Sequence, residues 1–341
     1  MSPIPTFTFA TTAEEVATAL SAEIRGKNVL ITGTSLNGIG FETARVIAKH
    51  ANLVIITGYN DQRLKLSEEA IKKEVPTVNI RRLNLDLGSL AGVRKAAAEV
   101  NTYSESIHVL IHNAAAAIGS FKLTVDGLES QMATDHVGPF LLTKLLTPKL
   151  LASADASYTP RVVFVSSGAH AFGAGVDFNV IEKPDPKTYN ASVGYFQAKS
   201  ANILTAIELS KRFKGAINAY SLHPGVIFTN INQKEESIPE MQALGILGPD
   251  GLPNKEKFDW KTIPQGAATY ILIVNRSVFV LMLFDSTVAA AFDPRISDKS
   301  GAYLDNSNVA NESVAPHSSD PANAERLWTV TENIIGEKFE F

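Results

Sequence analysis

Short apolar segments recur along this chain, and most of them are followed by a longer segment with helical spacing. Two of them, LVIIT (53–57) and RVVFV (161–165), each contain a single polar residue. Strands have this composition when helices cover both faces of their sheet. Strands that alternate with helices pair in parallel through right-handed crossovers. The sequence therefore predicts an α/β fold with a doubly wound parallel sheet and helices on both faces.

Seven apolar segments mark the predicted strands, and no Pro-, Gly- or Ser-rich linker divides the chain. The strands are expected at 29–32, 53–57, 78–85, 109–112, 161–166, 217–222 and 302–304. A period of 3.6 residues predicts helices over 41–50, 61–74, 89–102, 128–151 and 195–213. Residues 1–341 are expected to form a single domain, with a C-terminal extension near 305–341.

Residues 227–262 are irregular, carry many turn-forming residues and follow a predicted strand. Long segments at the carboxyl end of a strand lie over the ligand crevice of an open α/β sheet. We expect this segment to be a substrate lid, with an ordinary surface loop as the alternative. Its apolar side chains suit a lipophilic ligand and, equally, packing against the sheet; they are Ile227, Phe228, Ile231, Met241, Leu244 and Ile246.

Charge and composition argue against several classes of function. The chain has a net charge of −4 and no basic stripe, so nucleic acid is not expected as a partner. It has no cysteine, and its seven histidines lack ligand spacing, so no metal is expected. The N-terminus lacks the features of a secretory signal, which favours a cytoplasmic location. Asn275, Arg276 and Asp285 interrupt the apolar stretch 271–292, which favours a buried helix or strand over a membrane span.

A glycine-rich segment, ITGTSLNGIG (31–40), joins a predicted strand to a predicted helix. Gly33, Gly38 and Gly40 would let backbone N–H groups approach an anion at the helix N-terminus. Ile39 and Gly40 occupy the positions where a triphosphatase loop requires Lys and Ser or Thr, which argues against a triphosphate. A pyrophosphate is the better ligand, and a turn that simply reverses the chain is the alternative.

The end of the second predicted strand bears on the choice of cofactor. A carboxylate there would bind the ribose 2′-hydroxyl of NAD and repel the 2′-phosphate of NADP. The residues at 57–60, TGYN, contain no acid, and Asp61 is expected to cap the next helix. NADP is therefore favoured over NAD, although no arginine stands at position 59. The side chains that could donate hydrogen bonds to a phosphate are Ser35, Tyr59, Asn60 and Arg63.

Tyr195 and Lys199 stand four residues apart on a predicted helix, so both side chains emerge on one face. A free tyrosine has a pKa of about 10, and a neighbouring ammonium stabilises its phenolate. Such pairs also arise by chance on amphipathic helices. This pair gains weight because the carboxyl ends of parallel strands share one edge of a sheet. The residues expected at that edge are Asp86, Asn113, Ser166, Ser167, Pro224 and Gly225.

Together these features resemble the short-chain dehydrogenase/reductase family over residues 27–304. Thr32, Gly33, Gly38 and Gly40 match the family's T-G-x-x-x-G-x-G motif with one additional residue between the first two glycines. The longer spacing, together with GPFLLTKLL, QGAAT and GAYLDN, is similar to the retinol dehydrogenase-like branch and its fungal relatives. The resemblance implies a Rossmann-type fold with about seven strands.

The resemblance also implies roles for the matching residues. Tyr195 corresponds to the acid/base that donates a proton to the substrate oxygen during reduction. Lys199 corresponds to the lysine that stabilises the tyrosinate and holds the nicotinamide ribose, and Ser167 to the residue that orients the carbonyl. The expected cofactor-binding residues are Gly33, Ser35, Leu36, Asn37, Gly38, Ile39, Gly40, Tyr59, Asn60, Asp86, Leu87, Asn113, Ala114, Tyr195, Lys199, Pro224, Gly225, Val226 and Thr229.

Two segments depart from the family's pattern. Position 135 is Asp, where the family usually has an Asn that holds a water in the proton relay behind the lysine. We expect the Asp135 carboxylate to pair with Lys199 and to reduce activity without abolishing it, and we count it with the catalytic residues. The segment VNRSVFVLMLFDS (274–286) is extra relative to the family, and is interpreted as a lengthened helix, an association surface or an error in the gene model.

The predicted function is that of an NADP-dependent oxidoreductase. It would transfer a hydride between nicotinamide and a carbonyl or alcohol of a small lipophilic substrate. The alternative is a weakly active or inactive NADP-binding sensor or scaffold, because fold does not fix function. The intact set of Ser167, Tyr195 and Lys199 favours the enzyme. A homo-oligomer is expected, because dimers and tetramers are common in the family.

Overall fold

The computed structural model describes residues 4–267, 287–305 and 308–340 of the chain. Its main sheet has the strand order β10-β9-β6-β5-β4-β1-β2-β3, and only the β9–β10 pair is antiparallel among the described strands. Because β1 lies beside β4, the order of the strands reverses between them, where an open α/β sheet binds its ligand. The strands are β1 (Asn28–Ile31), β2 (Leu53–Gly58), β3 (Ile80–Asn84), β4 (Val109–His112), β5 (Arg161–Val165), β6 (Asn218–Leu222), β9 (Tyr303–Asp305) and β10 (Asn308–Val309).

The predicted doubly wound sheet is confirmed, with eight strands in place of the predicted seven. Each predicted strand is present within a few residues of its expected bounds. The additional strand is β10, which lies in the segment interpreted as a C-terminal extension. Its two residues pair with β9, at Asp305 and Leu304. A strand this short has no periodicity that a sequence can reveal.

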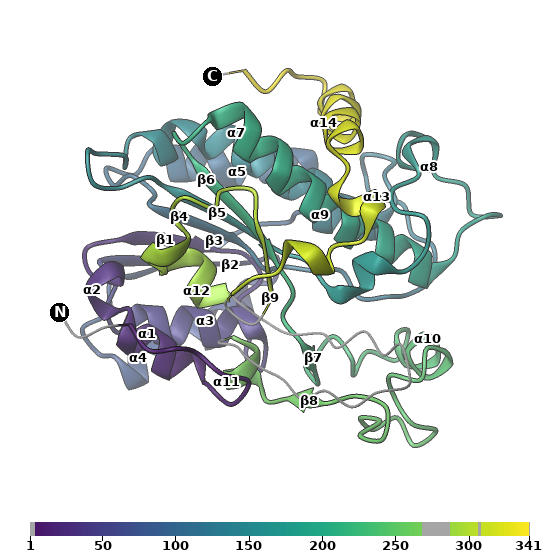
Figure 1. Ribbon diagram of the computed structural model, residues 1–341, viewed down its shortest axis with the longest axis horizontal. Coiled ribbons are helices and arrows are strands. Elements are labelled where there is room, and N and C mark those ends of the chain that lie inside the picture. The colour runs from purple at the N-terminus through teal and green to yellow at the C-terminus, as the bar shows by residue number, and fades with distance from the viewer. Residues whose placement is uncertain (1–3, 268–286, 306–307, 341) are drawn as a thin grey trace.

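Helices cover both faces of the sheet (Figure 1). Along β1, Val29 and Ile31 belong to one buried cluster while Leu30 belongs to the other. This explains the continuous apolar strands. The first cluster packs against α1 (Ala13–Ala19), α3 (Ile39–Ala48), α4 (Asp61–Glu74) and α12 (Thr287–Phe292); the second packs against α5 (Leu90–Asn101), α7 (Gly138–Leu151), α9 (Ala191–Phe213) and α14 (Pro321–Ile335). The remaining α-helices are α2 (Ser21–Ile24), α6 (Ser130–Met132), α8 (Phe178–Glu182), α10 (Ile238–Ala243), α11 (Ile263–Gly266) and α13 (Pro316–Ser319).

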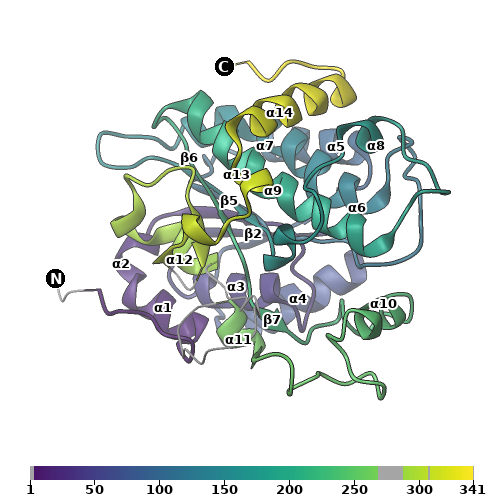
Figure 2. The same ribbon diagram turned by 45° about the vertical axis from the view of Figure 1, so that its right-hand side comes forward.

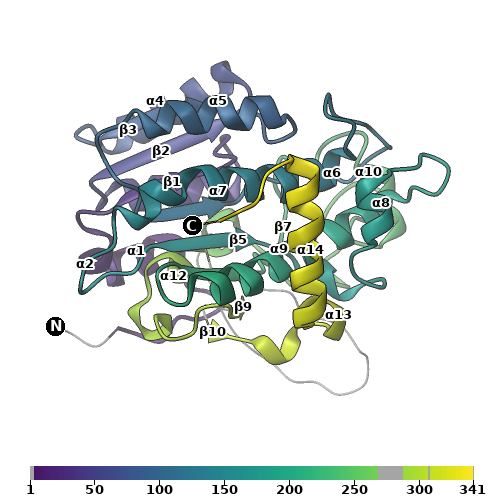
Figure 3. The same cartoon turned by 90° about the horizontal axis from the view of Figure 1, so that it is seen from above.

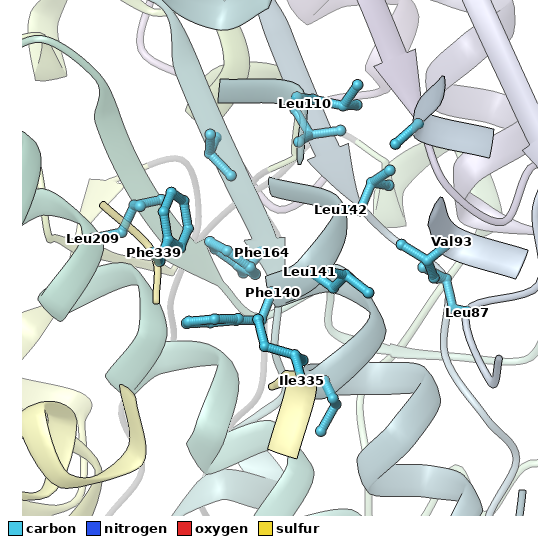
Figure 4. Packing of buried hydrophobic residues seen from close by; sticks show 14 of the residues in the cluster. Leu87, Val93, Leu110, Phe140, Leu141, Leu142, Phe164, Leu209, Ile335 and Phe339 are labelled. Carbon is cyan, nitrogen blue, oxygen red and sulfur yellow. The ribbon is translucent and has the colours of Figure 1, made fainter. Parts of the chain in front are cut away.

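The C-terminal segment is part of the core. Phe140 of α7 packs edge-on against Trp328 of α14, with ring centroids 4.7 Å apart, and against Phe339 at 5.5 Å. Figure 4 shows Phe140 and Phe339 with Ile335 on the face of the sheet that carries Leu110 and Phe164. The packing of α14 on α7 and α9 is therefore continuous with the main hydrophobic core.

Side-chain caps fix where several helices begin. Asn190 caps α9 by accepting the Val193 N–H at 2.9 Å, so this helix starts four residues before its predicted start. Asn60 caps α4 by accepting the backbone N–H of Arg63 at 3.0 Å. The prediction that Asp61 caps α4 is therefore wrong.

Residues 227–262 stand beyond the edge of the main sheet. The segment contains α10 and ends in β8 (Trp260–Lys261), which pairs in parallel with β7 (Val226–Ile227). Figure 2 shows α10 and its connections beside β7, outside the layers of the main sheet. The loop that was expected to be irregular is thus anchored at both ends by a small second sheet.

Most of the apolar stretch 271–292 lies outside the described residues, as does the extra segment 274–286. Its described end, α12, is buried. None of the helices that the structure describes is long and apolar enough to cross a membrane. The cytoplasmic location stays a prediction.

Candidate active site

The predicted site residues follow the carboxyl ends of neighbouring parallel strands. Gly33 follows β1, Asn113 follows β4, and Ser167 follows β5. The register of β1 with β4 and of β4 with β5 sets these ends side by side at one edge of the sheet. This edge includes the β1–β4 junction, where the sheet order reverses.

The glycine loop and the loop after β4 are in close contact. Gly33 has φ +72°, and a Cβ added to it would lie 2.7 Å from Cα of Ala114. The Asn113 side-chain amide donates to the carbonyls of Thr32 (2.9 Å) and Gly33 (3.0 Å), and a Cβ on Gly40 would clash with that amide. These contacts require glycine, so the segment is more than a turn that reverses the chain.

The N-terminus of α3 has the features of an anion-binding site. Gly38 is its N-cap and supplies no side chain that could satisfy the first N–H groups of the helix. Such orphan N–H groups and the helix dipole favour a phosphate. Asn37 adopts a left-handed φ of +59°, and the carbonyl of Leu36 accepts a hydrogen bond from Asn230 at 2.5 Å. The residues present therefore fit a pyrophosphate. Residues 227–262, the segment predicted to be a lid and called the lid segment below, contact the glycine loop through Asn230.

Glycine at position 33 is expected to be required for stability. Gly33→Ala should lower the free energy of unfolding by about 2–5 kcal/mol, combining left-handed strain with overpacking against Ala114. Gly127→Ala is the matched control, because Gly127 has φ +75° and nothing lies within 4 Å of its added Cβ. It should cost only the strain, about 1–2 kcal/mol. Equal losses in urea unfolding without cofactor would contradict the close-contact interpretation.

The end of β2 presents polar groups and one accessible aromatic ring. Tyr59 is 68% exposed, and its carbonyl accepts a hydrogen bond from Asn84 at 3.3 Å. Asp61 directs its carboxylate to the guanidinium of Arg82, at 2.7 Å. Asp61, the acid that follows β2 most closely in the sequence, is thus the first residue of α4 and already paired.

Most of the remaining predicted cofactor residues lie in loops that follow the carboxyl ends of strands. Asp86 is exposed, and its carboxylate accepts the Gly88 N–H at 2.9 Å. Gly225 has φ +89° and leads into β7, while the backbone N–H of Thr229 donates to the side-chain oxygen of Asn232 at 2.8 Å. The remaining members of the predicted set are Ser35 and Ile39 in the glycine loop and the start of α3, the buried Leu87 after β3, and Pro224 and Val226 after β6.

The two serines after β5 have different surroundings. Ser166 is fully engaged, because its hydroxyl donates to the carbonyl of Lys199 at 2.6 Å. Ser167 accepts the backbone N–H of Ala169 at 3.1 Å, as the N-cap of the short 3₁₀ helix Gly168–Ala171. The hydroxyl proton of Ser167 therefore remains available for a further acceptor.

Tyr195 lies in the first turn and a half of α9, within an apolar cluster formed largely by the lid segment. Its hydroxyl has no hydrogen-bond partner within the described ranges of the chain. The cluster is separate from the two that line the sheet. It contains four of the six apolar side chains for which packing against the sheet was the alternative to a ligand, Phe228, Ile231, Met241 and Ile246. Its members are Ile118, Tyr189, Ala191, Tyr195, Phe228, Ile231, Ile238, Met241, Ile246, Leu247 and Trp260.

Lys199 and Asp135 form a buried ion pair. The Lys199 Nζ lies 2.9 Å from Oδ2 of Asp135 and 5.3 Å from the ring centroid of Tyr195. Oδ1 of Asp135 accepts the backbone N–H of Ala116 at 2.6 Å. Burial raises the pKa of Asp135. Burial opposes the charge on Lys199, but the attraction of Asp135 and Tyr195 outweighs it and raises the pKa of the lysine.

Asp135 reaches Lys199 from a π-helical turn. The predicted helix over 128–151 is interrupted by a π-helix, Ala133–Val137, between α6 and α7. Single π-turns inside helices are frequent at functional sites. Gly138 begins α7 and lies against the backbone of Leu87, where a larger residue would not fit. This turn could not be read from the sequence, because its apolar spacing is that of an ordinary helix.

Sequence reasoning missed two side chains that support these loops. Asn230, in the lid segment, holds the glycine loop through Leu36. His170 donates through Nδ1 to the carbonyl of Ser167 at 2.7 Å. The position of His170, three residues after Ser167, was the available signal for the second contact.

A glycine loop at a strand-order reversal, near a Ser that follows a strand and a Tyr and a Lys on the helix fastened to that strand end, has the architecture of a dinucleotide-dependent α/β enzyme. A family model of the short chain dehydrogenases matches residues 27–178. The chain is 33% identical to short-chain dehydrogenase TIC 32 A, chloroplastic, of Brassica napus, over 96% of this chain and 93% of that protein. It is 31% identical to human retinol dehydrogenase 13 (92% and 86%) and 32% identical to short-chain dehydrogenase/reductase prx1 of Penicillium rubens (90% and 84%). The chain belongs to the short-chain dehydrogenase/reductase family of oxidoreductases, whose members bind nicotinamide cofactors.

Solved structures agree with this fold. A Mycobacterium paratuberculosis protein of uncharacterised function superposes with a TM-score of 0.65 and 25% identity, covering 94% of this chain and 98% of that chain. The NADPH-bound carbonyl reductase from chicken fatty liver superposes with a TM-score of 0.55 and 19% identity, covering 82% and 96%. The second likeness concerns the fold alone.

Proposed function

We propose that this protein is an NADP-dependent oxidoreductase that interconverts a carbonyl and an alcohol on a small lipophilic substrate. The observation that carries the proposal is the grouping of Ser167, Tyr195 and Lys199 around the carboxyl end of β5. The Ser166–Lys199 hydrogen bond (2.6 Å) and the Lys199 contact with the Val165 carbonyl (3.4 Å) fasten α9 to that strand end.

In this proposal each side chain has a separate task. The Ser167 hydroxyl donates to the substrate carbonyl while its oxygen is held by the Ala169 N–H. Tyr195 donates its proton to the same oxygen during reduction and accepts it during oxidation. Lys199 stabilises the tyrosinate that results, because its ammonium lies near the Tyr195 ring.

The cofactor supplies the hydride when it is bound. The backbone N–H groups at the start of α3 would hold its pyrophosphate, and Gly33 and Gly40 would let the backbone approach it closely. Lys199 would contact the nicotinamide ribose, and Asp86 would lie near the adenine.

NADP is proposed over NAD because no carboxylate stands at residues 57–60. Asp61 pairs with Arg82 and is one residue inside α4. A lipophilic substrate is proposed because Tyr195 lies among apolar lid residues such as Phe228, Met241 and Trp260.

A cofactor-and-substrate panel tests the proposed function. NADPH and NADH oxidation would be followed with straight-chain aldehydes from acetaldehyde to decanal, aromatic ketones, and the polar carbonyls glyoxylate and dihydroxyacetone. NADPH should give at least tenfold higher kcat/KM. Each added methylene should raise kcat/KM about fourfold until the apolar site is filled. NADPH binding without turnover of any member would instead favour the sensor or scaffold function, in which Asp135 neutralises Lys199.

A further inference from the structure

Hydrogen bonds join the C-terminal segment, residues 315–331, to three residues near the site: His136 beside Asp135, Ser200 directly after Lys199, and His170, which holds the Ser167 carbonyl. The segment comprises α13 and most of α14, and α14 packs across α9 (Figure 3). Building on the proposed function, we propose that this segment is a positioning element that holds Asp135, Lys199 and Ser167 in place from outside the active site.

The contact with the Asp135 turn is made by Thr331. The Thr331 hydroxyl donates to the carbonyl of Leu327 (2.8 Å), so it accepts from Nε2–H of His136, at 2.8 Å. The other ring nitrogen of His136, Nδ1, accepts from Thr205 of α9 at 3.3 Å. Burial lowers the pKa of His136 to about 3, so the ring is a neutral bridge with a defined tautomer.

His136 transmits this contact to Asp135 because the two residues are neighbours in the π-helical turn Ala133–Val137. A π-turn is a short irregularity within a helical segment, and this one separates α6 from α7. The bridge from Thr331 through His136 to Thr205 therefore fixes the turn against both α14 and α9. Because the turn is fixed, the Asp135 carboxylate stays in contact with the Lys199 ammonium, 2.9 Å away.

The contact with the Ser167 loop is made through His170. The backbone N–H of Ala315 donates to Nε2 of His170 at 3.3 Å, so Nδ1 carries the proton donated to the Ser167 carbonyl. The carbonyl of His170 in turn accepts from Nε2–H of His317 at 2.9 Å. His170 is buried, and burial lowers the pKa of its ring. The tautomer of His170 and the position of Ser167 thus depend on the chain at 315–317.

The contact with α9 is made by Ser318 of α13. The hydroxyls of Ser318 and Ser200 are 2.8 Å apart, and both residues are fully buried. Ser200 directly follows Lys199. The same short element therefore touches the Ser167 loop and the turn of α9 that carries the lysine, which is the arrangement expected of a device that fixes their separation.

Two threonines on α14 provide a matched test. Thr331 and Thr329 both donate to the carbonyl four residues earlier, at 2.8 Å and 3.1 Å, but only Thr331 also contacts His136. Thr331→Val should lower kcat about tenfold with the best carbonyl of the panel and shift the pH–rate profile, because losing the His136 bridge to Thr205 lets α9, which carries Tyr195 and Lys199, move relative to β5. Its NADPH dissociation constant should change less than twofold. Thr329→Val should match the wild type, and Thr331→Ser, which keeps the hydroxyl, should recover most of kcat.

The possible results separate the two proposals. Wild-type kcat and pH profile in Thr331→Val would overturn the positioning role. Parallel loss of kcat, NADPH binding and thermal midpoint, without recovery in Thr331→Ser, would also overturn it, because that pattern indicates general destabilisation. Absence of any turnover by the wild-type protein would contradict the proposed function, and with it the positioning role that rests on that function.

Discussion

Replacing Tyr195 with phenylalanine is expected to lower kcat for carbonyl reduction by about 10²- to 10⁴-fold, the usual contribution of a positioned acid or base. The phenyl ring keeps its place among Ala191, Phe228 and Met241, so the apolar cluster is retained. Only the hydroxyl is lost, and it has no hydrogen-bond partner elsewhere in the described chain. The measurement is single-turnover reduction with NADPH, alongside the NADPH dissociation constant, which should stay within about threefold.

Tyr189→Phe is the control for this variant. Tyr189 belongs to the same cluster, but its hydroxyl donates to the Gly119 carbonyl at 3.1 Å and accepts from Gln131 at 2.7 Å. Burial raises the pKa of Tyr189, which makes it a poor proton donor at neutral pH. Its loss should cost about 1 kcal/mol of stability and little kcat. If Tyr195→Phe kept more than a tenth of the wild-type kcat, the acid/base assignment would be refuted.

The sheet could be predicted from sequence because its signal is local and repeated. Strands such as Leu53–Gly58 are continuously apolar because helices cover both faces of the sheet. The two buried clusters contain the side chains that pack on those faces. The strand β10 and the small second sheet of β7 and β8 were not predicted. Each of these three strands is two residues long and is defined by the strand that it pairs with. A local pattern of residues does not encode that pairing.

The sequence could predict those site residues that come just after the ends of strands. Gly33, Asn113 and Ser167 lie at one edge because parallel strands end together. The supports behind them were not predictable, since they join residues far apart in the chain. His136 meets Thr331 across 195 positions, and His170 meets Ala315 across 145. Similarly, Asn60 and Asp61 both suit a helix cap, and only the backbone geometry decides between them.

Breaking the Asp135–Lys199 pair is expected to have the largest effect on stability. Lys199→Met should lower the free energy of unfolding by about 3–5 kcal/mol, because it leaves the buried Asp135 carboxylate without its cation. Asp135→Asn combined with Lys199→Met removes both charges and should recover at least half of that loss. Urea unfolding at pH 7 without cofactor measures both. No recovery in the double variant would mean that the lysine stabilises the fold through packing alone.

The pH dependence of this loss has a defined sign. Because the pKa of Lys199 is raised above its ordinary value in the folded protein, the ammonium contributes stability that is fully present at neutral pH. The wild-type protein loses that contribution only as the pH rises through the raised value, in the strongly alkaline range. The difference between wild type and Lys199→Met should therefore be constant from pH 7 to about pH 9 and shrink above the ordinary lysine range.

The single variant Asp135→Asn completes this set of substitutions. It should raise activity, whereas Lys199→Met should abolish it. The introduced amide oxygen would still accept the Ala116 N–H, but the side chain would no longer neutralise the ammonium 2.9 Å away. More of the lysine's charge would then act on the tyrosinate, so kcat at pH 7 should rise and the pH–rate profile should move about one unit lower. The measurement is kcat for alcohol oxidation between pH 6 and 10. An unchanged rate and profile would show that the Asp135 carboxylate does not restrain this enzyme.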